Sequence, residues 1–240
     1  MAYSRKSARG PRSRNLREGP IMDMRGMQDT MAGRAYAYRI FHIVFGADPG
    51  SEMLRLLAGD MAQQALSLFN QGAVKQALAL CTDLAAHAND EQLIEGLRQE
   101  HDRALVLPGP SYVHPWESPY VGKETMLFQP STLDVRARYA AYGYIAKDKG
   151  HFPEDHVSMM CDFLAELALR THDACARAQA GEVSSLVADQ AAFIETHMLT
   201  WLSKFSEKFA ESNAGGFYTL FAAALLAFVT EDRAYLLTLS

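Results

Sequence analysis

A seven-residue stretch, HFPEDHV at positions 151–157, gathers the side chains of this sequence that are best suited to chemistry. Asp155 directly precedes His156, and a carboxylate beside an imidazole can act in acid–base catalysis when a second positioned group is present. The stretch also suits a helix start, because Pro153 is favoured at the first helical position and the carboxylates of Glu154 and Asp155 complement the helix dipole. We predict a helix start, with an Asp155–His156 enzyme or nucleotide-binding protein as the alternative.

Other pairs of potential metal ligands have spacings that do not match a known type of site. His151 and His156 lie five residues apart across the expected helix start, so they would not share a helical face as paired ligands do. His172 and Cys175 are one helical turn apart but lack further obvious ligands. The sequence contains no HExxH, GxSxG or phosphate-binding GxxxxGK motif. We therefore predict no metal site.

The three cysteines, Cys81, Cys161 and Cys175, are odd in number and include no CxxC pair. They favour neither a disulfide framework nor a cysteine zinc site. Cys81 falls on an apolar stripe with helical spacing, so we predict that it is a core residue. No apolar segment typical of a signal peptide follows the basic N-terminal residues. We expect a cytoplasmic protein.

The elements that must position these side chains are helices. From Ala32 onward the apolar residues recur with helical spacing, and no segment shows the sustained alternation that strands require. The apolar run at 217–229 is shorter than the roughly 20 residues of a membrane-spanning helix, so it predicts a buried helix. We predict an all-α fold, with a single-domain helical bundle over residues 31–240.

A proline-rich stretch, residues 107–124, interrupts the helical pattern and carries PWESPY at positions 115–120. Each proline fixes its own backbone and pushes the preceding residue out of the helical region. Trp116 therefore sits in a loop, where a large indole either lines a groove or belongs to the core. Trp201 and Phe205, at helical spacing, are interpreted as core residues.

Charge is spread unevenly along the chain. The first thirty residues hold seven Arg or Lys against three acidic residues, a net charge of +4 that leaves −9 for the rest of the chain. Because the segment is rich in Arg, Ser, Gly and Pro, we predict that residues 1–30 form a disordered basic extension, with a nucleic-acid-binding arm as the alternative. The acidic body argues against nucleic acid as a main partner and is compatible with a basic peptide.

Two motifs, PWESPY at 115–120 and PEDH at 153–156, resemble those of the TorD/DmsD family of cytoplasmic chaperones. The likeness continues through LFQPSTLDVRARYAAYG between the motifs and through WLSKF and GFYTLF after them, so it covers roughly residues 32–232. Within the family the sequence looks closest to the DmsD-like branch.

Members of that family are all-α proteins that mature molybdenum-containing oxidoreductases of the dimethyl sulfoxide reductase type, which are exported folded through the twin-arginine pathway. The resemblance implies a chaperone rather than an enzyme, with no catalytic residue and no cofactor. The implied partners are the twin-arginine leader and the body of a molybdoenzyme catalytic subunit, with at most transient contact with the export machinery at the membrane and no nucleic acid. A monomer or a domain-swapped dimer is plausible for such a chain.

The positions that match the family's leader-binding residues lie in the two motifs. They are Trp116, Ser118 and Tyr120 in the first motif, and Glu154, Asp155 and His156 in the second. Carboxylates bind arginine through charge-assisted hydrogen bonds, and aromatic rings offer faces for guanidinium stacking, so these residue types suit a leader with paired arginines. The resemblance thus implies a helix start that also presents a binding surface.

Overall fold

The fold is helical throughout the described part of the chain. A computed structural model describes residues 24–69, 72–122, 127, 129–145, 153–212 and 216–239. Within those ranges the regular elements are helices, and extended pairing is limited to one bridge between Trp116 and His156. The predicted all-α fold is confirmed.

The helices differ widely in length. In chain order they are α1 (Met24–Gly46), α2 (Ser51–Ala58), α3 (Asp60–Leu66), α4 (Gly72–Ala85), α5 (Glu91–His101), α6 (Ser118–Val121), α7 (Pro130–Ala141), α8 (Val157–Ala176), α9 (Ala180–Phe193), α10 (Leu202–Glu211) and α11 (Gly216–Thr238). A 3-10 turn, η1 (Ser67–Phe69), follows α3. Two π-helical turns, η2 (Asp102–Val106) and η3 (Ile194–Met198), follow α5 and α9.

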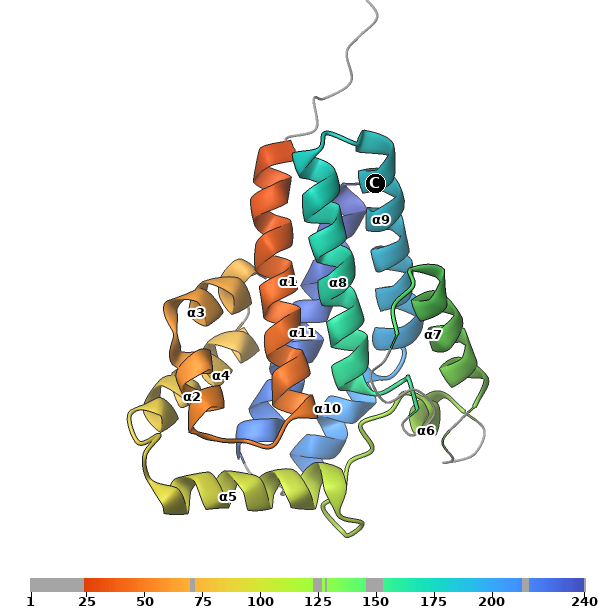
Figure 1. Cartoon of the computed structure of the whole chain (residues 1–240). Coiled ribbons are helices and arrows are strands. Elements are labelled where there is room, and N and C mark those ends of the chain that lie inside the picture. Colours follow the sequence, from red (N-terminus) through yellow and green to blue (C-terminus); the bar gives the residue numbers. More distant parts are fainter. Residues whose placement is uncertain are drawn as a thin grey trace, which may run out of the picture.

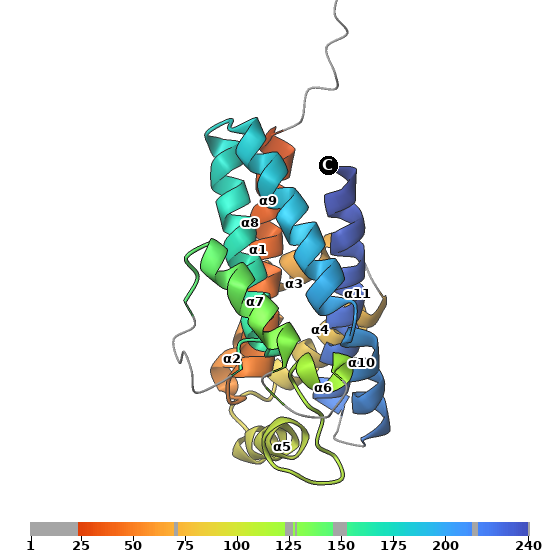
Figure 2. The ribbon, with the colours of Figure 1, turned by 90° about the vertical axis from the view of Figure 1, so that its right-hand side faces the viewer.

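Four long helices form the centre of the molecule. Helices α1, α8, α9 and α11 stand side by side, and each packs against its neighbours in the bundle (Figure 1). Helices α2, α3 and α4 cover one flank, and α7 lies on the other. Helix α5 runs across the lower end of the bundle in Figure 1, and Figure 2 looks along its axis there. The two motifs belong to the segments around α6 and the start of α8.

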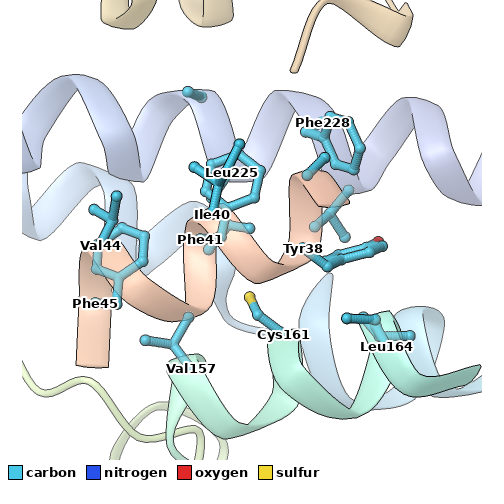
Figure 3. Close-up of a cluster of buried hydrophobic side chains, with 14 of the residues drawn as sticks. Tyr38, Ile40, Phe41, Val44, Phe45, Val157, Cys161, Leu164, Leu225 and Phe228 are labelled. Carbon is cyan, nitrogen blue, oxygen red and sulfur yellow. The ribbon is translucent and has the colours of Figure 1, made fainter. Parts of the chain in front are cut away.

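The core lies on both sides of α1. In Figure 3 the apolar stripe of α1 faces Val157 and Cys161 of α8 on one side and Leu225 and Phe228 of α11 on the other. The ring centroids of Phe41 in α1 and Phe228 in α11 lie 5.6 Å apart. Each fully buried large apolar side chain contributes about 1.5–3 kcal/mol, so this seam accounts for much of the stability.

Three predicted core residues are in the core. Cys81, Trp201 and Phe205 are each fully buried, so the interpretation of the first as a structural thiol and of the other two as core aromatics is confirmed. Burial also raises the pKa of the Cys81 thiol to about 12, which keeps it protonated and unreactive at neutral pH.

A buried polar network runs through all four central helices. Asp232 of α11 accepts hydrogen bonds from Arg34 Nε and Nη2 and from the Tyr38 hydroxyl of α1, the last two at 2.8 and 2.6 Å. Arg34 Nη1 also donates to Gln190 of α9 at 2.8 Å, and Gln190 Nε2 donates to Thr171 of α8 at 2.9 Å. All five side chains lie in the interior, so each buried charge and amide has a partner there.

Helix α1 begins earlier than the sequence pattern indicates. Residues 24–30 were predicted to belong to the disordered extension, but they form the first turns of α1. Met27 and Met31 are 4% and 0% exposed, and this burial explains why the segment is ordered despite its polar neighbours. The remaining residues of the predicted extension, 1–23, lie outside the described residues.

Helix α8 begins later than predicted. Its first residue is Val157, and His156 is the N-cap, with Nδ1 accepting a hydrogen bond from Ser158 N at 3.1 Å. Pro153, Glu154 and Asp155 lie in the turn that precedes the helix, so Pro153 is not at the first helical position and the carboxylates are not in the first turn. The reason is tertiary, because the backbone of this turn is bonded to residues 115–117.

The C-terminal end of α1 approaches the start of α8 closely at Gly46. A Cβ added to this glycine would overlap Ser158 Oγ and lie 2.9 Å from Ser158 Cβ. Ser158 Oγ in turn donates to the His42 carbonyl at 2.9 Å. The absence of a side chain at position 46 is therefore what lets the two helices meet at this point.

We expect Asp232→Asn to lower the free energy of unfolding by about 3–5 kcal/mol, because it leaves the buried Arg34 guanidinium without its counter-charge. Urea unfolding at neutral pH measures the loss. Glu231→Gln is the matched control, since it removes an exposed charge from the adjacent position of α11. Equal unfolding midpoints for the two variants would contradict the role given to the network.

We expect Gly46→Ala to cost about 1–3 kcal/mol of stability, because the added methyl group must displace Ser158 and push α1 away from α8. Thermal and urea unfolding would measure it, and combining the change with Ser158→Gly should recover part of the loss. Gly96→Ala serves as the control, because no atom lies within 4 Å of the added Cβ at that exposed α5 position. A similar loss in both variants would argue against a packing cause.

Candidate functional site

The two motifs meet in the tertiary structure. Glu117 N donates to the Asp155 carbonyl at 3.0 Å, and Val157 N donates to the Pro115 carbonyl at 2.8 Å. Between these two hydrogen bonds, Trp116 pairs with His156 as an antiparallel bridge. Their rings lie edge to face with centroids 5.2 Å apart. Segments about forty residues apart in the sequence therefore form one unit.

Asp155 holds the first motif from inside the protein. Its side chain is fully buried, and Oδ2 accepts a hydrogen bond from Ser118 N at 2.8 Å, at the first residue of α6. Ser118 is also fully buried. Asp155 Oδ1 and Ser118 Oγ are buried without a hydrogen-bond partner. The structure thus places both predicted site residues beneath the surface, where they fix the backbone of the motif.

Glu154 is engaged with an arginine of this chain. Its two carboxylate oxygens accept from Arg136 Nε and Nη2 at 2.7 and 2.8 Å, a bidentate pair with α7. Its backbone carbonyl accepts from the Tyr139 hydroxyl at 3.1 Å. Glu154 is only 3% exposed. This carboxylate therefore anchors the PEDH turn to α7.

His156 is partly buried and neutral. Burial lowers its pKa to about 4, and the nearby rings of His42 and His101 contribute in the same direction. The capping hydrogen bond agrees with this state, because Nδ1 can accept from Ser158 N only when that nitrogen carries no proton. At neutral pH the imidazole therefore adds no charge to the site.

Trp116 and His156 line a pocket of about 620 Å³ at the lower end of α1 and α8. Apolar and aromatic side chains supply most of its wall, together with two further histidines. The remaining lining residues are Arg39, His42, Phe45, Gly46, His101, Leu105, Val106, Tyr112, Tyr144, Ile145, Ser158, Met159 and Asp162. The volume lies within the range of small-ligand sites and accommodates several side chains of a peptide.

The charged groups of the pocket neutralise each other. Asp162 accepts hydrogen bonds from Arg39 and from the Tyr144 hydroxyl. It is the single carboxylate among the described lining residues. Glu154 and Asp155, the two carboxylates expected to face a ligand, are not part of this wall. The pocket surface is therefore mainly aromatic and apolar.

Tyr120 lies apart from the pocket wall. Its ring stacks on Trp201 with centroids 5.3 Å apart and planes at 28°, and its hydroxyl donates to the His114 carbonyl at 2.9 Å. Burial raises the pKa of the Tyr120 phenol. Of the six predicted site residues, the structure brings Trp116 and His156 to the pocket and places the other four as supports.

Sequence reasoning missed several pocket residues from α1 and α8. Arg39 and His42 lie on α1, and Asp162 lies on α8. Each is a polar residue next to a core position in the sequence, so the apolar helical pattern by itself predicts that it lies on the surface. The one available signal was the occurrence of Arg39 and His42 one turn apart on the same helix, which indicates a shared face but not a pocket.

Nothing in the described ranges is arranged to bind a metal. No group of three His, Cys, Asp or Glu side chains there is placed to hold an ion. Cys175 is buried, and His172 Nε2 contacts Gln28 at 3.1 Å, so that pair is used within the fold. His151 lies outside the described residues. Across the helices that the structure describes, none is long and apolar enough to span a membrane.

The helical fold with its paired motifs defines a known class of protein. The family model described as the nitrate reductase delta subunit matches residues 70–207, which is more than half of the chain and contains both motifs. The chain belongs to this family, and the resemblance to the TorD/DmsD chaperones is confirmed at that level. The placement in the DmsD-like branch stays a prediction.

Several similar curated proteins carry the name chaperone protein TorD. The TorD of Vibrio cholerae is 32% identical over 137 residues, covering 57% of this chain and 56% of that protein. The TorD of Vibrio parahaemolyticus is 29% identical over 123 residues, covering 51% and 56%. That of Photobacterium profundum is 27% identical with the same coverage. The chain thus spans just over half the length of the curated relatives it matches.

We expect His156 to make stability depend on pH. Its folded pKa of about 4 lies below the ordinary value of 6.5, so the unfolded chain binds the proton more readily. The contribution of neutral His156 to the free energy of unfolding is complete above pH 6.5 and is lost as the pH falls toward 4. The loss is about 3 kcal/mol at most. Urea unfolding between pH 7 and pH 4.5 should show a steeper loss in the wild type than in His156→Asn, which keeps a capping acceptor.

His87→Asn is the matched control for this measurement, because His87 is exposed and lies outside the pocket. That variant should follow the wild-type acid profile. If His156→Asn and His87→Asn lost stability in parallel with the wild type, the acid loss would come from other groups.

Proposed function

We propose that this protein is a cytoplasmic chaperone that binds the twin-arginine signal peptide of a dimethyl sulfoxide reductase-type molybdoenzyme subunit. It retains the leader and assists folding of the subunit until the molybdenum cofactor has been inserted, before export. Family membership and the TorD name of its relatives support a role in maturation. The leader, the client class and the cytoplasmic location belong to the proposal.

The observation that carries this proposal is the meeting of both motifs at one pocket. Trp116 of the first motif and His156 of the second contact each other and line the same wall. A leader peptide combines an apolar segment with two arginines, and a largely apolar pocket with aromatic faces can receive both kinds of side chain. Two motifs brought to one pocket support a binding role better than a purely structural one.

Arginine recognition here falls to rings rather than to the carboxylates of PEDH. Glu154 is paired with Arg136, and Asp155 is fully buried with Oδ2 on the Ser118 amide. Neither carboxylate lines the pocket, so neither faces a ligand arginine there. Trp116 and Tyr112 in the wall offer faces on which a guanidinium can stack. Neutral His156 does not repel a cation, and the net charge of −9 after residue 30 attracts a basic leader over a longer range.

The alternative of an enzyme that uses the Asp155–His156 pair has less support. Asp155 Oδ2 is used by the Ser118 amide, and His156 Nδ1 is used by the Ser158 amide. Each side chain is therefore oriented by a backbone amide and not by the other side chain. A general base and its orienting partner would instead be hydrogen-bonded to each other.

Calorimetric titration with synthetic twin-arginine leaders, taken from genes that neighbour its own, tests the proposal. We expect saturable binding at micromolar or tighter affinity to one leader, weakened when its arginine pair becomes alanine. Trp116→Ala should reduce the affinity about tenfold or more, since it removes the largest ring of the pocket. His156→Asn should reduce it less, because the cap is kept.

The control for the histidine change is again His87→Asn, which should bind the leader like the wild type. Full affinity in Trp116→Ala would move the binding surface away from this pocket. If no leader bound the wild type, family membership would still support the fold but no longer the leader-binding function.

A further inference from the structure

His197 lies between two carboxylates at the base of the first motif. Its Nδ1 contacts the carboxylate of Glu117 at 3.1 Å, and its Nε2 contacts Asp134 of α7 at 2.9 Å. Glu117 and His197 are each 2% exposed, while the Asp134 side chain is half-exposed. The contacts join PWESPY and α7 to the π-helical turn η3, in which His197 lies 63 residues beyond Asp134 in the sequence.

Each nitrogen of the His197 ring faces a carboxylate. A neutral imidazole has one N–H donor and one acceptor, and a carboxylate cannot donate to the acceptor nitrogen. Both contacts are hydrogen bonds only when the ring carries two protons or when one carboxyl group carries the extra proton. Burial raises the pKa of Glu117, and the hydrogen bond with His197 opposes that effect. Removing the proton would place a carboxylate against a lone pair.

Other charged groups complete the surroundings of the cluster. Arg138 of α7 lies 4.0 Å from Asp134 on the exposed side, and the charge of Asp155 acts on Glu117 from the second motif. The Trp201 indole donates to the His197 carbonyl at 2.6 Å, and the Tyr120 ring stacks on Trp201. The first motif is thus attached to the η3–α10 junction through two of its side chains.

Glu117 is placed so that its anchoring bears on the pocket. It lies between Trp116, which lines the pocket, and Ser118, whose amide is held by Asp155. From the side of α8, backbone hydrogen bonds hold the same segment. The contacts of His197 with Glu117 and Asp134, which form a clamp, hold the segment from the side of η3.

We propose that His197, together with Glu117 and Asp134, is a positioning residue for the pocket, holding PWESPY so that Trp116 is presented to a bound leader. This inference rests on the proposed function for its ligand. His197 itself is not part of the pocket wall, so it acts through Glu117 and not by touching the peptide. No assignment in the two motifs includes it, because it lies some forty residues beyond PEDH.

The test compares His197→Gln and Glu117→Gln with the wild type, using protein labelled with 5-fluorotryptophan. The chain has two tryptophans, so Trp116→Phe assigns the two fluorine resonances. We expect the Trp116 resonance to shift in both variants of the free protein, and leader affinity to fall about tenfold.

Glu195→Gln is the matched control, because it removes an exposed ion pair with Arg233 from the same turn. It should leave the Trp116 resonance and the affinity unchanged. If His197→Gln does not fold, Asp134→Asn weakens the same clamp from its half-exposed end. An unshifted Trp116 resonance with wild-type affinity would overturn the positioning role. A wild type that binds no leader would refute the proposed function, while the resonance of the free protein would still decide the positioning role.

Discussion

The buried ion pair between Arg34 and Asp232 is the constraint on which the rest of the bundle depends. A guanidinium in the interior costs several kcal/mol unless a carboxylate and further acceptors meet it. Asp232 of α11 and Gln190 of α9 accept hydrogen bonds from Arg34 of α1, and the Tyr38 hydroxyl of α1 donates to Asp232. These helices can therefore slide or rotate against each other only by breaking charged hydrogen bonds, so one register of the bundle is favoured over its neighbours.

The site is a consequence of that register. With α1 held in place, Gly46 at its end meets Ser158 at the beginning of α8, and the pocket opens beside this contact. The motif segments that close the pocket are largely non-helical, so their backbone groups need partners from outside the segment. Asp155 Oδ2 accepts from the Ser118 amide, and the backbones of the two motifs bond to each other around the bridge between Trp116 and His156. Many of the polar contacts of the motifs therefore hold the backbone of the motifs in place.

The motif residues therefore form two groups, those that support the pocket and those that line it. In the core network the polar groups are matched, whereas around the motifs Trp116 Nε1, Ser118 Oγ and Asp155 Oδ1 are buried without a hydrogen-bond partner. Unsatisfied buried groups typically cost about 1–3 kcal/mol each. The motif region is therefore held less firmly than the bundle beneath it, and such unevenness is common where a protein binds a partner. A modest change in contacts there can alter the pocket while the core stays fixed.

The sequence by itself determined the helical class, the core positions and the family. Helical spacing is a local property, so it identifies Cys81, Trp201 and Phe205 as interior without any knowledge of their neighbours. It could not decide where the carboxylates of PEDH point, because their partners are set by packing. Arg34 lies 198 residues from Asp232, and His197 lies 80 from Glu117. Only the tertiary structure brings such pairs together, and desolvation then decides which motif residues support the pocket and which line it.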